Sequence, residues 1–271
     1  MNRILLVIGL LITSLSFSQF GNEWIDYSKK YYSFKVSADG VYRLDYSMLA
    51  ASGVPVSSIA PDEFQIFGFE EEQQIWVEDG GDGSFDTGDY ILFFGQRNNT
   101  WLDSMMYENP NQVANKYFPH YNDTINYYLT WDSSPNARIQ EETDVDFASY
   151  TIQPYFLKTN YSEGHDIYLE GYKIGGMSHA TYVDGEGWFG DYYWAGGAIN
   201  NQDDFLPTAN AYTSAGAPNA TGVAVSAGAS NSSYSGSGNH HLQLQWGAGN
   251  IVLYDTIYEA YPKITLPFTL P

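Results

Sequence analysis

The residues with the clearest capacity for chemistry form an acidic, glycine-rich stretch at 78–89. It reads EDGGDGSFDTGD and contains four Asp and one Glu. Oxygen ligands at fixed offsets in a loop of about twelve residues, with a glycine at the sixth position for the sharp turn, are typical of calcium binding. Gly83 occupies that sixth position. The sequence therefore predicts a candidate calcium site with the ligands Glu78, Asp82, Ser84, Asp86 and Asp89.

Two features of the same stretch favour another interpretation. Gly80 stands at the third position, where an acid is expected, and the residues after Asp89 are strand-like instead of helical. Acids packed this closely repel one another, so the stretch needs either a bound cation or full solvation. A solvated Gly/Asp hairpin turn without a metal is the alternative, and both interpretations stay open.

The sequence was also compared with the patterns of nucleotide binding, serine hydrolysis and glycoside hydrolysis. Residues 185–190, GEGWFG, match the dinucleotide glycine fingerprint, but that motif needs a following helix to hold the pyrophosphate, and DYYW follows instead. The chain has no Gly-x-Ser-x-Gly elbow of a serine hydrolase. Carboxylate pairs for glycoside hydrolysis could be drawn from the 32 acids, but sequence spacing cannot give their separation. None of these patterns predicts an active site.

The histidines and tryptophans fit structural roles. No His-Glu-x-x-His motif occurs among His120, His165, His179, His240 and His241. His240 and His241 are adjacent, so in a strand they point to opposite faces and cannot share one metal. Exposed tryptophans could stack on sugar rings, whereas core packing is the default for large aromatics; the candidates are Trp101, Trp188 and Trp194.

Composition excludes several classes of protein. The 271 residues include 11 Lys+Arg against 32 Asp+Glu, which gives a net charge of −21 that disfavours nucleic acid as a partner. A hydrophobic fraction of 44% with 24 Tyr and 15 Phe can form a packed core, which argues against disorder. There is no Cys, so a disulfide, a thiolate metal site and a cysteine nucleophile are excluded from this sequence.

The first segment predicts export. Residues 1–18 begin with Arg3, continue through an apolar run and end in the small-residue pattern Ser16-Phe17-Ser18, which is typical of a cleavable signal peptide. We therefore expect an exported protein.

The elements that follow predict an all-β fold of two successive antiparallel β-sandwich-like domains, at 19–148 and 149–271. Strands are expected at 31–36 and 41–44, joined by an Asp39-Gly40 hairpin, and at 64–68, 74–77, 90–95 and 124–131, with a short helix at 46–52. In the second half they are expected at 150–157, 180–183, around Val223 and Val225, and at 241–246, 251–254 and 264–268. The chain stops within an apolar run, so we expect the second domain to be incomplete and the chain to be the front part of a longer polypeptide.

Several of these stretches, in this order, resemble one family. They are NEWIDYS at 22–28, YYSFKV at 31–36, DGVYRL at 39–44, DGSFDTGDYILFFG at 82–95, GEGWFG at 185–190 and HHL at 240–242. Together they are similar to the N-terminal region of PorU-type sortases, the gingipain-like cysteine peptidases of the type IX secretion system of Bacteroidetes. The resemblance covers nearly all of the chain after residue 18.

The resemblance implies β-rich N-terminal domains that precede a caspase-like peptidase domain. Such enzymes remove C-terminal sorting domains from secreted cargo at the cell surface, so the resemblance implies a location at the cell surface or in association with the outer membrane. Since this sequence has no Cys, no catalytic residue can be carried over, and we expect a non-catalytic region. Its expected partners are the downstream peptidase domain, outer-membrane secretion components and secreted cargo. A free-standing adhesive or carbohydrate-binding surface module is the alternative, and a hydrolase complete in itself is a third class.

Overall fold

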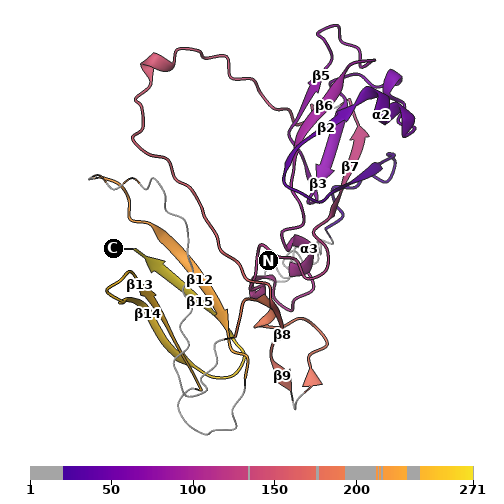
Figure 1. Cartoon of the computed structure of the whole chain (residues 1–271). Coiled ribbons are helices and arrows are strands. Elements are labelled where there is room, and N and C mark those ends of the chain that lie inside the picture. The colour runs from indigo at the N-terminus through magenta and orange to yellow at the C-terminus, as the bar shows by residue number, and fades with distance from the viewer. Residues whose placement is uncertain are drawn as a thin grey trace, which may run out of the picture. The chain divides into compact units, whose positions relative to one another are not determined.

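The computed structural model describes residues 21–133, 135–174, 177–192, 212, 214, 216–230 and 239–270 (Figure 1). The expected signal peptide at 1–18 lies outside these residues. The chain is mostly β and divides into two compact units, one from residues 1–96 and 125–141 and the other from 97–124 and 142–271. The predicted all-β fold is thus confirmed. Each unit is described by itself.

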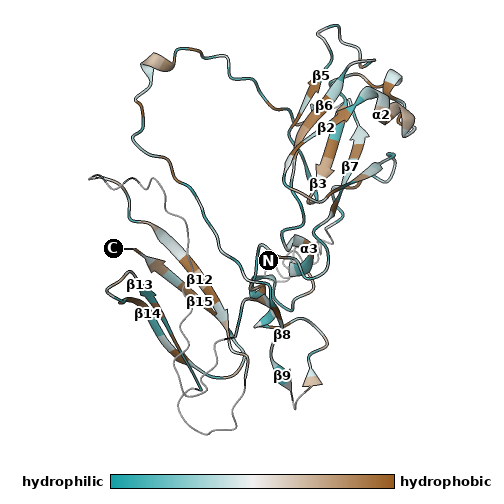
Figure 2. Cartoon of the chain, viewed as in Figure 1, coloured by the Kyte–Doolittle hydropathy of each residue, from teal (hydrophilic) through white to brown (hydrophobic). Residues whose placement is uncertain are grey.

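Two antiparallel sheets form the first unit. One has the order β1 (Tyr32–Val36), β7 (Ile125–Trp131), β3 (Phe64–Gly68) and β4 (Glu71–Glu72). The other has the order β2 (Gly40–Asp45), β6 (Tyr90–Gly95) and β5 (Ile75–Glu78). The strands at 64–68 and 90–95 have the bounds that the sequence predicts, and Figure 2 shows hydrophobic residues along both.

Aromatic rings join the two sheets into a sandwich. The ring of Phe93 on β6 lies 5.6 Å from that of Phe34 on β1 and 5.4 Å from that of Tyr127 on β7. These rings belong to a core whose largest buried side chains are Tyr127, Phe64, Phe93, Ile66, Ile75, Ile91, Leu129 and Val36. Gly68 has a packing role, because a Cβ there would lie 2.3 Å from the Tyr127 ring.

The predicted Asp39-Gly40 hairpin is wrong, although both of its strands exist. β1 pairs with β7 and β2 pairs with β6, so the chain crosses from one sheet to the other at this turn. The crossing lets Phe34 and Tyr42 approach Phe93 in the shared core, each with ring centroids 5.6 Å away. The alternation of apolar and polar residues shows which face of a strand is buried. It does not show whether the next strand pairs with it in the same sheet or packs against it from the other sheet.

The predicted short helix is α2 (Tyr46–Ala51), with Leu49 buried. Gly53, whose φ is +80°, follows its end as the sequence predicts. A 3₁₀ turn, η1, spans Val56–Ser58.

The second unit contains four two-stranded antiparallel sheets among the described residues. They are β8 (Ile167–Glu170) with β11 (Glu186–Phe189), β9 (Lys173–Ile174) with β10 (Met177–Ser178), β12 (Thr221–Ala227) with β15 (Lys263–Thr269), and β13 (His240–Trp246) with β14 (Ile251–Tyr258). The unit also has the short helix α3 (Trp101–Ser104) and the 3₁₀ turns η2 (Pro110–Gln112) and η3 (Phe147–Ser149). The strand expected around Val223 and Val225 is confirmed as β12.

Two strand predictions in this unit are wrong. Residues 150–157 form no strand and lie in an extended connection (Figure 1). Residues 180–183 contribute only a bridge at Tyr182, and the strand lies at 186–189. The second unit resumes at residue 142, near the boundary expected at 148, and it also includes 97–124, which lies within the first domain expected at 19–148.

Candidate functional site

The acidic stretch 78–89 connects β5 to β6, two neighbouring antiparallel strands. Glu78 pairs with Tyr90 at the mouth of this connection, so the stretch is a hairpin loop. Its turns depend on glycine, since Gly80, Gly81, Gly83 and Gly88 all have positive φ. The loop is therefore shaped by local backbone geometry, and no helix flanks it.

A single aromatic side chain anchors the loop. Phe85 is 4% exposed, and its ring lies 4.7 Å from that of Phe64 and 5.9 Å from that of Tyr46. The Tyr46 amide also donates to the Asp89 carbonyl at 2.9 Å. The acids on both sides of Phe85 are consequently held at the surface.

Three of the loop carboxylates accept hydrogen bonds from nearby amides. Asp79 Oδ1 accepts from Gly81 N at 3.0 Å, and Asp82 Oδ1 accepts from Ser84 N at 2.8 Å. Asp89 Oδ2 accepts from Asp86 N at 2.6 Å. Such side-chain turns stabilise the loop without a metal.

The predicted calcium ligands lie in one loop, but their oxygen atoms do not converge on a common position that a metal ion could occupy. Glu78 Oε2 accepts from Trp76 Nε1 at 3.3 Å, so this carboxylate is engaged with its own strand. Within the described ranges, no three His, Asp or Glu side chains are arranged to hold a metal ion. The oxygen donors of Asp82, Ser84, Asp86 and Asp89 suit calcium chemically, and calcium binding here stays a prediction.

A second cluster, which the sequence did not predict, lies in the second unit. We define the His120 cluster as Tyr107, His120, Tyr168, Tyr182 and Glu186. Tyr107 Oη donates to the Glu186 carbonyl at 2.7 Å and lies 2.7 Å from His120 Nε2. Tyr168 Oη donates to Glu186 Oε1 at 2.8 Å, and the Tyr182 hydroxyl contacts that of Tyr121. Residues from the 97–124 segment and from β8 and β11 meet here.

The hydrogen bonds of Tyr107 fix the proton of His120. A tyrosine hydroxyl has one proton, and a carbonyl can only accept, so this proton points to the Glu186 carbonyl. His120 Nε2 must then carry the proton that it donates to Tyr107. Nδ1 is left as a bare lone pair in neutral His120, and this atom is buried without a hydrogen-bond partner in the described part of the chain.

Burial controls the charges of this cluster. It lowers the pKa of His120 below the ordinary value, against the opposing effect of the Asp103 carboxylate. It raises the pKa of Glu186, against hydrogen bonds from Tyr168 and the Val183 amide. It also raises the pKa of Tyr107, which keeps this hydroxyl protonated. The arrangement favours neutral side chains.

Glu186 and Gly187 shape the turn that enters β11. The Val183 amide donates to Glu186 Oε2 at 3.2 Å, while the Glu186 amide donates to the Val183 carbonyl at 3.1 Å. Gly187 has φ of +136°, and a Cβ there would lie 3.1 Å from Cε1 of His120. Gly187 of the 185–190 glycine motif, which lacks the following helix of a nucleotide site, thus allows close packing against a histidine.

The remaining candidates have structural contacts. His241 Nε2 lies 2.7 Å from Asp255 Oδ1, whereas His240 stacks on Tyr258 with centroids 4.9 Å apart, so the two histidines have different surroundings. Trp188 is half-buried and packs edge-on against Tyr168, with ring centroids 5.4 Å apart. Trp101 begins α3, and Trp194 lies outside the described residues.

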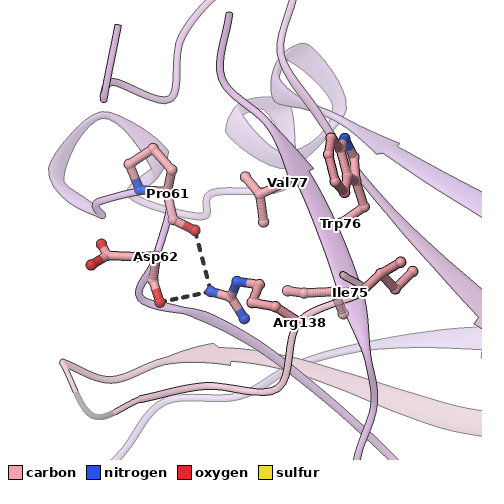
Figure 3. Close-up of a pocket in the computed structure, with 7 residues that line it drawn as sticks. Pro61, Asp62, Ile75, Trp76, Val77 and Arg138 are labelled. Atoms are coloured by element: carbon pink, nitrogen blue, oxygen red, sulfur yellow. Dashed lines mark hydrogen bonds between the residues drawn. The ribbon is translucent and has the colours of Figure 1, made fainter. Parts of the chain in front are cut away.

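An open depression of about 280 Å³ lies beside β5 in the first unit. Arg138 crosses it and donates to the Asp62 carbonyl at 2.6 Å and to the Pro61 carbonyl at 3.3 Å (Figure 3). Most of the remaining wall is apolar, from Ile75, Trp76, Val77 and Ile139. The guanidinium therefore holds the backbone of this edge in place.

Comparison with known proteins gave no match: no family model, curated protein or solved structure is similar to the chain. In the described ranges no helix is long and apolar enough to cross a membrane.

Proposed function

We propose that this chain is the non-catalytic N-terminal β region of an exported gingipain-like cysteine peptidase that acts as a type IX secretion sortase. In this role it supports a downstream peptidase domain of the same polypeptide at the cell surface. That domain removes C-terminal sorting domains from secreted cargo.

The observation that carries the proposal is the order of the motifs along an all-β chain. The stretches at 31–36 and 39–44 supply β1 and β2, and the stretch at 82–95 supplies the acidic hairpin loop and β6. The stretches at 185–190 and 240–242 supply β11 and the start of β13. Each motif thus has a definite place in the fold, as expected for residues that maintain an architecture.

The His120 cluster favours a supporting role over chemistry. Tyr107 and Glu186 are each no more than 9% exposed, and both use their polar atoms to bond other parts of the second unit. A general base must reach a substrate proton, whereas these groups hold a backbone turn and a neighbouring ring. The geometry supports the cluster as a clamp between the 97–124 segment and the two-stranded sheet of β8 and β11.

The first test is to read the native gene past the codon for Pro271. We expect an open frame of several hundred codons that encodes a His followed downstream by a Cys. A stop codon at that point would overturn the proposal and favour the alternative of a free-standing surface binding module, for which glycan binding by the isolated chain is the direct assay.

The functional test is an in-frame deletion of residues 19–271 that keeps the signal segment. We expect cargo that retains its sorting domain to accumulate, and we expect full-length protein supplied in trans to restore processing. Normal cargo processing by the deleted strain would contradict the proposal. Immunoblotting of the peptidase domain provides the control, because it separates loss of function from loss of the protein.

A further inference from the structure

We propose that Phe156 and Leu157 form a cleavage site for an endopeptidase that selects large apolar side chains, and that the two fragments stay assembled after the cut. The site lies in the extended connection at 142–157, within the second unit (Figure 1). Phe156 is 83% exposed and Leu157 is 82% exposed. Exposed connections with small backbone constraints are where proteolytic cuts concentrate.

The backbone around this site is available to an enzyme. Endopeptidases bind the residues around the cleaved bond as an extended chain whose backbone groups pair with the enzyme. In the described part of the chain, every hydrogen bond of 142–157 joins two residues of that stretch, and no backbone group of 151–157 takes part in one. Apart from Tyr155, whose ring lies 5.3 Å from that of Tyr212, every residue from 151 to 160 is exposed.

The other exposed aromatic residues of the connection lie in a local turn. Phe147 belongs to η3, and the Tyr150 amide donates to the Phe147 carbonyl at 3.4 Å. The Tyr150 hydroxyl donates to Asp144 Oδ2 at 2.6 Å. This turn must open before an enzyme can bind it in an extended form, so the bonds after Phe156 and Leu157 are cut first. Hydrolysis adds one water molecule across the bond, which leaves a carboxylate on one fragment and an ammonium group on the other.

The cut does not separate the fragments, because the 97–124 segment precedes the cut in the sequence but packs against residues that follow it. Tyr107 is 5% exposed, and its hydroxyl donates to the Glu186 carbonyl at 2.7 Å. Val113 is 4% exposed, and its carbonyl accepts a hydrogen bond from Nζ of Lys263 on β15 at 3.3 Å. The first fragment is therefore bonded to two distant parts of the second fragment.

Two stacked ring pairs hold the second fragment soon after the cut. The ring of Tyr117 stacks on that of Tyr161, and the ring of Phe118 stacks on that of His165, each pair with centroids 4.1 Å apart. Both pairs join a residue before the cut to one after it. Since residues 151–160 lie outside these contacts, hydrolysis after Leu157 leaves the packing of the second unit intact.

Limited digestion tests the position of the site. Chymotrypsin selects large apolar side chains, and we expect it to cut after Phe156 and Leu157 before any other position in the described part of the chain. Phe156→Asn with Leu157→Asn should slow cleavage of the connection at least ~tenfold. The matched control is Val145→Asn with Ile152→Asn, which alters two exposed apolar residues that this enzyme does not select and should leave the rate unchanged.

Mass spectrometry identifies the cut, and melting temperatures confirm that both double variants stay folded. An earlier cut elsewhere in the described part of the chain, or equal cleavage rates for the two double variants, would overturn the assignment of the site.

A chain that can be cut only in the connection tests the assembly. Replacement of 151–157 by the recognition sequence of a site-specific peptidase restricts cleavage to this stretch. We expect the two fragments to elute together with the mass of the uncut chain, measured by light scattering, and to separate in urea. The urea midpoint of the cut protein should fall on dilution, because dissociation into two fragments depends on concentration.

A hydroxyl deletion on each side of the cut shows which contacts hold the fragments together. Tyr107→Phe should raise their dissociation constant at least ~tenfold, since it removes a buried bond between them. Tyr172→Phe, at a residue 50% exposed in the second fragment, should leave it unchanged. Fragments that separate in buffer without urea, or equal dissociation constants for the two variants, would overturn the proposed assembly.

Discussion

The hydroxyl of Tyr107 lies 2.7 Å from Nε2 of His120, in a cluster in which Tyr107 is buried and His120 is half-buried. The same hydroxyl donates to the backbone carbonyl of Glu186, which is 79 positions away in the sequence. One oxygen atom thus connects the 97–124 segment to β11. Because it both accepts and donates, its loss would leave two buried groups without partners.

Replacement of this hydroxyl should destabilise the second unit. We expect Tyr107→Phe to lower the free energy of unfolding by about 1–3 kcal/mol, since the Glu186 carbonyl and His120 Nε2 stay buried without their bond. Urea denaturation measures the effect. The matched control is Tyr117→Phe, because Tyr117 is 39% exposed and keeps its stacking on Tyr161, 4.1 Å away. Equal stabilities of the two variants would contradict this role for Tyr107.

Gly187 should tolerate no side chain. Gly187→Ala places a Cβ 3.1 Å from Cε1 of His120 and adds strain at φ of +136°, so we expect a loss of about 2–3 kcal/mol in unfolding free energy. Gly83→Ala is the matched control, since Gly83 also has positive φ but has open space around its Cβ position. The difference between the two variants reports the contacts with His120 and Tyr107 together with the greater backbone strain at φ of +136° than at φ of +78°. A Gly187→Ala protein no less stable than Gly83→Ala would refute these contacts.

His120 should make the second unit sensitive to acid. Burial lowers the pKa of His120 below 6.5, so below that pH the unfolded chain binds more protons than the folded chain. The contribution of His120 to stability is therefore complete above about pH 6.5. It declines as the pH falls from the pKa of His120 in the unfolded chain toward its lower pKa in the folded chain. Urea midpoints should drop over this range.

Glu186 has the opposite effect on the pH dependence of stability. Burial raises its pKa above 4.5, so its contribution is present at low pH and is lost as the pH rises from 4.5 through the folded value. The His120→Gln variant separates the two effects, because it removes only the histidine titration and retains a donor near the Nε2 position. An unchanged difference in stability between this variant and the unaltered chain from pH 5 to pH 7 would contradict the assignment.

Calcium should stabilise the first unit if the predicted ligands bind it. We expect millimolar calcium to raise the melting temperature and chelation to lower it, because an ion that binds only the folded state shifts unfolding by mass action. The double substitution Asp82→Asn with Asp86→Asn should abolish this response, whereas Glu108→Gln, outside the loop, should preserve it. If chelation leaves the melting temperature unchanged, the acidic stretch is a solvated hairpin loop.

The sequence by itself determined the local features of the chain. Short runs rich in aromatic and β-branched residues predicted β3 at Phe64–Gly68 and β6 at Tyr90–Gly95 with their observed bounds, because such side chains favour strands. The glycines of the 78–89 stretch predicted tight turns, and four of them have positive φ. These features depend on residues that are close together in the sequence, so the sequence alone predicts them.

Only the tertiary structure decided how these elements meet. The Asp39-Gly40 turn joins two sheets instead of two paired strands, and residues 150–157, patterned as a strand, form no strand. The His120 cluster gathers side chains far apart in the sequence, and no spacing could reveal that Glu186 would lie beside Tyr107. Periodicity shows which face of an element is buried, whereas the partner that covers it is chosen by contacts between distant segments.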